Sequence, residues 1–386
     1  MIREPFGGNT ENTVVVSSLE QFGEAVNGVI TLADNATYII SGTIDLLGKR
    51  IVCGTNNSIF GYGSENCILK STGLTSQYLL TSQYSLQLNF VTITAAKAVN
   101  LNAIDSDQTL DWVRVNFTNC AEIGIIKDFS NFIGETLGIL NSDKFTFDGT
   151  IGTIGMTNTI FSGTGTDKIV ILPSTLTITR RFRVLYSSFI CTGTATGIDV
   201  DNATIPTEGF ILDTVNFSGG ATYLNGINNT SNDALILNTK GISNSGNIGQ
   251  YYMQDNVTAT TITVEDTYYK VSGTTTVGQY IEKFTHTNNR LTYVGAFIGY
   301  FKVSAFMSVT SGNNNVIAFR VAKNGTTIAQ STSKSTTSGA GRSENIKLSD
   351  IVELNTNDYI EVFVTNTSGT NVVTVESLNL ICERLN

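Results

Sequence analysis

The sequence is poor in charge, proline and histidine, and each shortage narrows what the chain can be. Only 14% of the 386 residues are charged and three are proline, whereas glycine occurs 36 times. Threonine, serine and asparagine are prominent instead, a composition that favours an all-β protein with a hydroxyl- and amide-rich surface. His286 is the one histidine, which excludes a histidine triad or histidine metal site in the first 240 residues. The length predicts two or three domains.

The charge balance and the lack of long apolar runs exclude several partners. The net charge of −9 and the pI near 4.7 argue against nucleic acid or an anionic membrane as a partner. No run of about 18 apolar residues exists to span a bilayer. The first residues, Met1–Pro5, lack the pattern of a signal peptide. We therefore expect no nucleic-acid partner, no membrane insertion and no export by a cleaved signal.

The cysteines are odd in number and follow no metal-ligand spacing. They are Cys53, Cys67, Cys120, Cys191 and Cys382. We expect buried free thiols in a protein assembled in a reducing cytoplasm, with no metal and no other cofactor.

What the chain does contain is a periodic pattern of large apolar residues from Leu86 to about Gly246. The markers of this pattern, spaced by 24, 22, 22, 28, 28 and 25 residues, are Ile93, Phe117, Ile139, Phe161, Phe189, Phe217 and Ile242. Seven residues before each marker stand Leu86, Leu110, Phe132, Ile154, Phe182, Phe210 and Leu235. Five residues before stand Leu88, Trp112, Met156, Val184, Leu212 and Leu237, with Gly134 as the exception. Ile44 and Ile68 extend the markers toward the N-terminus.

Apolar residues two apart lie on one face of a strand, and the fixed offset to a third apolar residue implies a turn and a second short strand. One such unit cannot bury its apolar face alone, whereas stacked units bury a continuous column. The pattern therefore predicts a parallel β-helix with about three short strands in each coil. The alternative is a β-sandwich with evenly spaced strands.

The chain before the repeat predicts a leader and a capping helix, which we assign to residues 1–28. Residues 1–16 are a polar leader that ends in a strand at Thr13–Val16. The helix would begin with a capping box, bury one apolar face and end at Gly28. Its capping box and apolar face consist of Ser18, Gln21, Phe22, Ala25 and Val26.

Residues 29–246 are assigned to the β-helix, and two of their segments have a recognisable form. Gly42–Val52 and Ser58–Leu69, together with the capping helix, resemble the opening of the pectate-lyase-like right-handed β-helix family. The resemblance covers about residues 14–245 and implies a right-handed parallel β-helix. It leaves activity open, because that fold is found in lyases, hydrolases and inert adhesins.

After the Gly/Asn/Ser segment 243–249 the pattern changes to alternation with a period of two. The alternating runs are Thr258–Val264, Tyr268–Val271, Leu291–Tyr293, Tyr300–Val309, Val316–Val321, Asp358–Val364 and Val372–Leu380. Asn324-Gly325 is a strong hairpin signal and Ser368-Gly369 marks another turn. Residues 247–386 are therefore predicted to be an antiparallel β-sandwich.

Parts of this second region resemble the C-terminal jelly-roll modules of bacteriophage tail and fibre proteins, which are similar to tumour-necrosis-factor and C1q heads. The segments concerned are Gly299–Ala305, Phe319–Gly325, Leu354–Val362 and Asn288–Gly295. The resemblance implies a jelly roll that associates as a trimer. Asn357 stands where glycine is common in that family, and asparagine tolerates the left-handed turn conformation.

Two groups of carboxylates are candidates for carbohydrate chemistry, because glycosidases need a carboxylate pair. The first is Asp199 and Asp201 with Arg180, Arg181 and Arg183 one coil earlier, and the second is Asp105 and Asp107 beside Asp111. The resemblance implies that such Asp pairs or Asp/Arg clusters carry the reaction in pectin-degrading members. The alternatives are solvated loop residues or, for Asp199–Asn202, a Ca²⁺ site that lacks the glycine and distal Glu of a calcium loop.

Other polar and aromatic residues receive structural or glycan-contact roles. Trp112 and the phenylalanine markers are expected in the core, and His286 is expected to be structural. The candidates for glycan contact are Tyr78, Tyr84, Tyr251 and Tyr252. The asparagine clusters Asn228-Asn229 and Asn313–Asn315 predict ladders or loops.

Together these patterns predict a bacteriophage virion protein, a tail spike, fibre or capsid-surface protein. It would be a rigid homotrimer that contacts other virion proteins, is assembled in the bacterial cytoplasm and binds host-surface polysaccharide with avidity from its three copies. One alternative is a polysaccharide lyase or hydrolase on the β-helix, and another is a capsid-decorating protein without a receptor. The sequence alone assigns no catalytic, metal-binding or ligand-binding residue.

Overall fold

The computed structural model describes residues 12–206, 209–220, 222–227, 234–295, 298–339 and 341–385. It divides into two units, one with the residues up to Asn244 and one with those from Ser245. The described residues are almost entirely strands and turns, with short 3₁₀ turns at Leu19–Phe22 and Ala329–Ser331 and no α-helix. Among them we find no helix of the length and apolarity needed to cross a membrane. The predicted leader before Asn12 lies outside the described residues.

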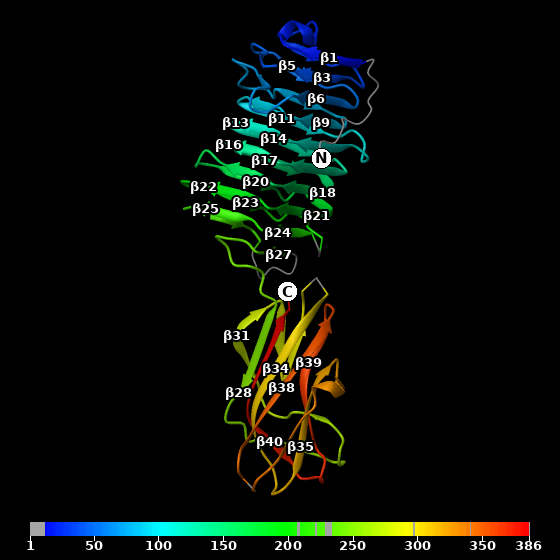
Figure 1. The fold of residues 1–386 in the computed structure, drawn as a ribbon, viewed down its shortest axis with the longest axis vertical. Helices are drawn as coiled ribbons and strands as arrows, with labels where there is room; N and C mark the ends of the chain where they lie inside the picture. The colour runs from blue at the N-terminus through cyan, green and yellow to red at the C-terminus, as the bar shows by residue number, and fades with distance from the viewer. Residues whose placement is uncertain are drawn as a thin grey trace. The chain divides into compact units, whose positions relative to one another are not determined.

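The first unit is a β-solenoid of three parallel sheets, and each coil except those at the two ends gives one strand to each sheet (Figure 1). Sheet A contains β1 (Thr13–Val16), β3 (Thr37–Ile40), β6 (Asn57–Gly61), β9 (Leu86–Asn89), β12 (Thr109–Val113), β15 (Asn131–Glu135), β18 (Thr150–Thr157), β21 (Thr177–Leu185), β24 (Phe210–Asp213) and β27 (Ala234–Leu237). Sheet B contains β2 (Val29–Thr31), β5 (Arg50–Val52), β8 (Leu80–Ser82), β11 (Lys97–Asn102), β14 (Glu122–Lys127), β17 (Phe145–Asp148), β20 (Lys168–Leu172), β23 (Thr196–Val200) and β26 (Thr222–Asn225). Sheet C contains β4 (Thr43–Asp45), β7 (Ile68–Lys70), β10 (Thr92–Thr94), β13 (Asn116–Thr118), β16 (Gly138–Leu140), β19 (Ile160–Ser162), β22 (Ser188–Cys191) and β25 (Asn216–Gly219). The predicted parallel β-helix is confirmed, and the evenly spaced sandwich is excluded.

The pairing register of sheet C reproduces the marker series of the sequence. Its partners, coil by coil, are Ile93, Phe117, Ile139, Phe161, Phe189 and Phe217. In sheet A the same holds for Leu86, Leu110, Phe132, Ile154, Phe182 and Phe210. The spacing therefore predicts which side chains stack, because a parallel register places equivalent residues of successive coils side by side.

Ile44 stands in register, paired with Leu69, but Ile68 and the last coil were predicted one residue out of register. Leu69, not Ile68, pairs with Ile93, because the fully buried side chain of this strand is Leu69. In the last coil Phe210 pairs with Ala234 instead of Leu235. Leu212 likewise pairs with Ile236 instead of Leu237, and Ile242 lies outside the strands of sheet C.

Aromatic rings form columns inside the solenoid. The Phe161 and Phe189 rings stack at 4.0 Å between centroids, and Phe189 and Phe217 stack at 4.9 Å. Trp112 is fully buried, as predicted, with its ring 5.5 Å from that of Phe117. Repeated coils thus bury identical ring types in register, which adds ring contacts of about 0.5–1.5 kcal/mol to the burial of their area.

Gly134 breaks the apolar pattern because the space is already filled. A Cβ at this position would lie 2.5 Å from Cδ1 of Leu137, and Leu137 is itself buried. The leucine of the adjacent turn therefore occupies the place that a side chain takes in the other coils.

From β9 onward, each turn by which the chain leaves sheet A passes through one residue with positive φ. Along the chain these residues are Phe90, Arg114, Thr136, Asn158, Tyr186, Thr214 and Asn238. From Phe90 to Thr214 their N–H groups donate to the next coil, as from Arg114 to the carbonyl oxygen of Glu135 at 2.8 Å. Most of them are neither glycine nor asparagine, so the turn imposes a left-handed conformation on residues that disfavour it.

The predicted capping helix is wrong. Gln21 does accept N–H groups of Ser17 and Ser18 through Oε1, at 2.6 and 3.0 Å, but the helical segment is the single 3₁₀ turn Leu19–Phe22. It ends at Gly23, whose φ is +101°, a backbone conformation outside any helix. Val26, expected on the buried face, is exposed.

The second unit consists of two antiparallel sheets with an apolar core between them. Sheet D orders its strands as β31 (Thr276–Glu282), β28 (Ile248–Met253), β40 (Val373–Arg384), β34 (Gly299–Thr310) and β38 (Glu344–Leu354), and β29 (Ala259–Thr260) pairs with β40. Sheet E orders its strands as β32 (Phe284–Thr287), β33 (Arg290–Tyr293), β39 (Tyr359–Asn366), β35 (Val316–Lys323) and β36 (Thr326–Thr327), while β30 (Tyr269–Lys270) pairs with β39 and β37 (Ser333–Thr336) with β35. The antiparallel class is confirmed, and the jelly-roll family stays a prediction.

The strand predictions for this unit are partly wrong in extent. The run predicted at Thr258–Val264 shrinks to the two residues of β29, and β28, β31, β32, β37 and β38 were not predicted. Asn324-Gly325 forms the expected hairpin turn between β35 and β36, with φ values of 52° and 76°. Asn357 has a φ of 73°, which is the left-handed conformation expected for it.

The five cysteines are all free and buried, as predicted. Burial raises the pKa of the Cys53 thiol to about 12 and that of Cys191 to about 11, since the thiolate loses its hydration in the core. These thiols therefore act as small apolar side chains.

Candidate functional site

The solenoid carries an open groove of about 450 Å³ at the turns that lead from sheet B to sheet A. It is lined by Ala103, Ile104, Asp105, Ser106, Asp128, Ser130, Thr150, Gly152, Thr179 and Arg180. These residues follow β11 and β14 and begin β18 and β21, so four successive coils contribute. With about 4.8 Å between neighbouring strands, the groove runs about 15 Å along the stack.

A β-bulge places the arginine of the groove. Where β18 pairs with β21, the single residue Gly152 lies opposite two residues, Thr179 and Arg180. The extra residue of a bulge is unpaired and its side chain is re-aimed, and Arg180 is exposed. A Cβ at Gly152 would lie 2.3 Å from the carbonyl oxygen of Ser130, so glycine is needed for the coils to approach this closely.

The two carboxylates of the groove differ in their roles. Asp128 accepts the N–H of Thr150 through Oδ1 at 2.8 Å. A Cβ at Gly149 would lie 2.0 Å from that oxygen, so Asp128 braces the turn. Asp105 is exposed, and its carboxylate accepts no hydrogen bond from the described residues. The groove thus offers hydroxyl groups, one free carboxylate and one guanidinium, which are groups that hydrogen-bond sugar hydroxyls.

The first predicted acid group, Asp199 and Asp201 with three arginines, does not come together as one site. Asp199 is buried, with Oδ2 2.6 Å from Nζ of Lys168 and Oδ1 accepting from Nδ2 of Asn225 at 2.7 Å. Asp201 lies beyond the strand and is exposed. Asp199 therefore braces neighbouring coils, and its cation is Lys168 and none of the three predicted arginines.

The three carboxylates of the second predicted group, Asp105, Asp107 and Asp111, do not come together either. Asp105 lines the groove, whereas Asp111 lies in β12 opposite Ile133 on the outer surface of sheet A. Asp107 is exposed in the turn and accepts from Nε2 of Gln108 at 3.3 Å. The structure thus brings Asp105 of one predicted group together with Arg180 of the other, a combination that the sequence analysis did not propose.

A second hollow, of about 660 Å³, lies on sheet D of the other unit. Its floor is a row across the strands, in which Tyr252 and Phe306 both pair with Asn379 and Phe306 also pairs with Lys347. Phe306 is 44% exposed, and Nζ of Lys347 lies 5.0 Å from its ring centroid. Tyr252 was a predicted contact residue. Phe306 was missed, although its outward place in the alternating run at Tyr300–Val309 was a usable signal.

The other predicted tyrosines have structural contacts. The Tyr78 hydroxyl donates to Glu122, and Nζ of Lys97 lies 5.2 Å from the Tyr78 ring. Burial, and then the contact with Glu122, raise the pKa of Tyr78. Tyr251 is fully buried, and Tyr84 is half-buried with its backbone N–H donated to Ser82.

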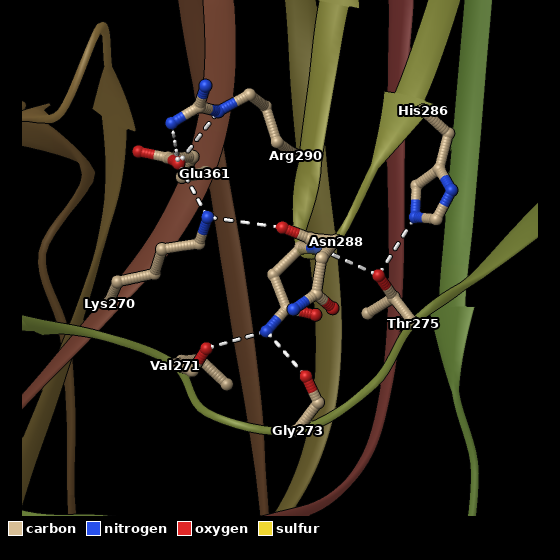
Figure 2. Close-up of polar contacts among 9 residues, drawn as sticks. Lys270, Val271, Gly273, Thr275, His286, Asn288, Arg290 and Glu361 are labelled. Atoms are coloured by element: carbon tan, nitrogen blue, oxygen red, sulfur yellow. Dashed lines mark hydrogen bonds and ion pairs between the residues drawn. The ribbon is translucent and has the colours of Figure 1, made fainter.

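His286 sits in a structural cluster of the second unit (Figure 2). Its Nε2 lies 2.8 Å from Oγ1 of Thr275, which also accepts the backbone N–H of Asn289 at 2.8 Å. The His286 ring lies 5.7 Å from that of Tyr251, and burial lowers the pKa of His286. These contacts agree with the predicted structural role.

Asn315 is buried and donates to Oγ of Ser311 at 2.9 Å, so it braces a loop, while Asn228 and Asn229 lie outside the described residues. No group of three or more His, Cys, Asp or Glu side chains within the described ranges is placed to hold a metal ion.

Comparison with known proteins gives likenesses of fold at low identity. No family model matches the chain, and no curated protein matches it. The enzymatically active domain of tailspike protein 4 from bacteriophage CBA120 is 12% identical, with a TM-score of 0.25 over 92% of this chain and 68% of that one. Tailspike protein 2 from an Escherichia coli O157:H7 bacteriophage is 9% identical, with a TM-score of 0.27 over 94% and 67%.

Two further likenesses cover about a third of this chain. The vertex protein P5 of PRD1 is 10% identical, with a TM-score of 0.26 over 36% of this chain and 96% of that one. Murine APRIL is 9% identical, with a TM-score of 0.25 over 36% and 99%. Identities and scores of this size assign the chain to no family.

Proposed function

We propose that this chain is a bacteriophage virion protein that binds a host-surface polysaccharide as a homotrimer. The observation that carries the proposal is the solenoid groove, which is open, polar and extended across four coils. A linear polysaccharide is an extended ligand with hydroxyl groups along its length. Ser106, Ser130 and Thr179 supply hydroxyl partners along the groove, and Asp105 and Arg180 supply charge-assisted ones.

The outer surface of sheet D supports the trimeric part of the proposal. Exposed apolar side chains gather there, with Tyr300 60%, Ile351 57% and Phe306 44% exposed. These residues lie on the neighbouring strands β34 and β38. Exposed aromatic and aliphatic side chains that gather on one surface are typical of subunit contacts. Three copies joined at this surface would present three grooves, and the combined avidity would exceed that of one weak site.

The polysaccharide part is tested by binding to a panel of purified bacterial capsules and lipopolysaccharides. We expect the unaltered protein to bind at least one member, and Arg180→Gln to weaken that binding by about tenfold, as for loss of a charge-assisted contact. Arg181→Gln is the matched control, because Arg181 is the next residue, is exposed and does not line the groove. Equal weakening by both variants, or binding to no member, would refute the proposal.

The trimeric part is tested by light scattering. The chain has a mass of 41.5 kDa, so we expect a particle of about three times that mass. Phe306→Asp should yield monomers, because a charge would be buried in the contact. Tyr186→Asp is the control, since Tyr186 is an aromatic residue that is 60% exposed on the solenoid. A monomeric unaltered protein would contradict this part.

The depolymerase alternative concerns the same groove. Asp105 and Asp128 are two carboxylates, the minimum for a glycosidase, but Asp128 is engaged by the Thr150 N–H. We expect no reducing ends to be released from a bound polysaccharide. Release that is abolished by Asp105→Asn would replace adhesion by hydrolysis as the function.

A further inference from the structure

The outer surface of sheet E carries an unusual concentration of positive charge for a chain with a net charge of −9. Four cationic residues from four different strands gather there: Lys270 of β30, Arg290 of β33, Arg320 of β35 and Lys334 of β37. We call these four residues and the three aromatic residues Tyr268, Tyr359 and Phe363 the cationic surface. Since its members lie far apart in the sequence, only the fold brings them together.

The strand β39 forms the middle of the cationic surface. Ile360, Val362 and Val364 point into the core, so the alternate residues Tyr359, Glu361 and Phe363 point outward. Phe363 pairs with Lys270 on one side and with Arg320 on the other. The two cations therefore flank one aromatic ring at a separation of about two strand spacings, roughly 10 Å.

The carboxylate of Glu361 lies at the centre of the cationic surface, and two neighbouring cations outweigh its single negative charge. Lys270 and Arg290 both contact Oε1 of Glu361, from Nζ at 2.8 Å and from Nη2 at 3.0 Å (Figure 2). The Glu361 side chain is only 2% exposed, whereas those of Lys270 and Arg290 are 34% and 36% exposed. The carboxylate is thus hidden beneath the two cations that face the solvent.

The remaining two cations have no ion pair within the described residues. Nε of Arg320 donates to Oγ1 of Thr332 at 2.8 Å, and its guanidinium lies 4.3 Å from the ring centroid of Tyr268. Lys334 is exposed beside Ala318. The other acidic group that acts on this surface is Asp266, whose charge reaches Tyr268.

The guanidinium groups are held in a defined orientation. Arg290 stacks on Tyr359 at 3.7 Å, as Arg320 does on Tyr268. A guanidinium fixed on an aromatic ring loses little conformational freedom when it binds, and its planar donors match a carboxylate. The aromatic edges beside these cations offer apolar surface to the C–H face of a sugar ring.

We infer that the cationic surface binds an acidic polysaccharide, one whose sugars carry carboxylates, at a site separate from the solenoid groove. The inference rests on the proposed function in taking a polysaccharide as partner, and it adds the charge class and a second location. Nucleic acid fits less well, because guanidinium groups already cover both tyrosine rings and Phe363 is the one ring of this surface left to stack on a base.

The test measures binding of a short polymannuronate, with maltooligosaccharide of equal length as the neutral probe. We expect the unaltered protein to bind the polymannuronate at low salt, to lose it at high salt, and to ignore the neutral probe. The double variant Arg320→Gln/Lys334→Gln should bind about tenfold more weakly, since it removes both unpaired cations. Lys49→Gln/Arg50→Gln, the same change of charge on the solenoid, should bind like the unaltered protein.

A second variant moves the affinity in the opposite direction. Glu361→Gln removes the central negative charge but keeps an oxygen that Lys270 and Arg290 can contact, so we expect polymannuronate to bind several-fold more tightly. A purely structural role for these residues would give weaker binding in both variants. Circular dichroism of each variant verifies the fold.

Three results would overturn the inference: no binding of polymannuronate by the unaltered protein, equal binding by the double variant, or equal binding of a DNA oligonucleotide of matched charge. Each of these results leaves the proposed function of the solenoid groove intact, because that function is tested separately, by the binding of Arg180→Gln to a neutral or acidic host polysaccharide. Conversely, if no host polysaccharide binds at the solenoid groove while polymannuronate still binds, only the proposed function is refuted.

Discussion

Replacing Phe189 by alanine should destabilise the solenoid strongly. Its ring lies between those of Phe161 and Phe217, at 4.0 and 4.9 Å, and it is fully buried. Phe→Ala in a core costs about 3–5 kcal/mol. Since two ring contacts of about 0.5–1.5 kcal/mol each are lost, we expect a loss of about 4 kcal/mol in the free energy of unfolding.

The assay is urea unfolding followed by the fluorescence of Trp112, the one tryptophan. Trp112 lies in β12 and Phe189 in β22, three coils further on. In a stack of coils each interface supports its neighbours, so loss at Phe189 should reach Trp112. With a slope of about 2–3 kcal/mol per molar urea, the midpoint should fall by roughly 1–2 M.

Two variants make this result interpretable. Ile190→Ala changes the next residue, which points outward, and should cost about 0.5 kcal/mol. Phe189→Leu keeps most of the volume but loses the ring contacts and should cost about 1–2 kcal/mol. If Phe189→Ala and Ile190→Ala shift the midpoint equally, the ring column does not stabilise the solenoid and the reasoning is refuted.

Three further predictions concern the turns, the thiols and acid stability. Thr136→Asn should raise the urea midpoint of the solenoid, because asparagine accepts the φ of 58° seen there and stands at the equivalent position 158. We expect the free energy of unfolding to rise by about 0.5–1 kcal/mol, and a lower midpoint would contradict this. A thiol reagent should label none of the five buried cysteines in the native protein and all of them after denaturation, because burial disfavours each thiolate; rapid native labelling would show an exposed thiol. Burial acts to raise the pKa of Asp45, but hydrogen bonds from Thr72 and Leu47 and the charge of Lys70 outweigh it and hold that pKa at about 2. A carboxyl whose pKa is lowered on folding stabilises the protein above its unfolded pKa, and this stability is lost as the pH falls, here from about 4 to about 2. Thr72→Val should reduce the loss of stability over this pH range. An unchanged midpoint of acid unfolding in this variant would show that Asp45 does not contribute.

The sequence predicts sheets A and C well because their strands recur at a constant offset within each coil. From Leu86 to Phe210 the apolar residues of both series match the observed pairing. The register fails in the last coil, where Ala234 fills the buried position. Alanine is apolar but small, and the nearest large apolar side chain is Leu235, one residue further along the chain.

The solenoid groove could not be predicted from the residues alone. Its arginine is set by the bulge opposite Gly152, and a bulge becomes visible only when two strands are aligned. Asp105 and Arg180 lie 75 residues apart, and no spacing rule links them. Strand β38 was missed although Ile346, Leu348, Val352 and Leu354 lie on its buried face, because Asp350 interrupts the apolar alternation.

The capping helix shows how a correct local signal can predict the wrong element. The capping interactions of Gln21 are present, but they belong to one 3₁₀ turn. Gly23 and Asn27 both adopt positive φ, which no helix allows. A cap thus identifies a helical start but does not establish the length of the helix.

The claim that this chain acts on the outside of a phage particle is tested most directly by where it sits. Gold-labelled antibody against the chain, applied to intact particles that encode it and read by electron microscopy, should mark the host-facing surface of the virion. Particles that carry no label, while the chain is detected free in the lysate, would contradict the account.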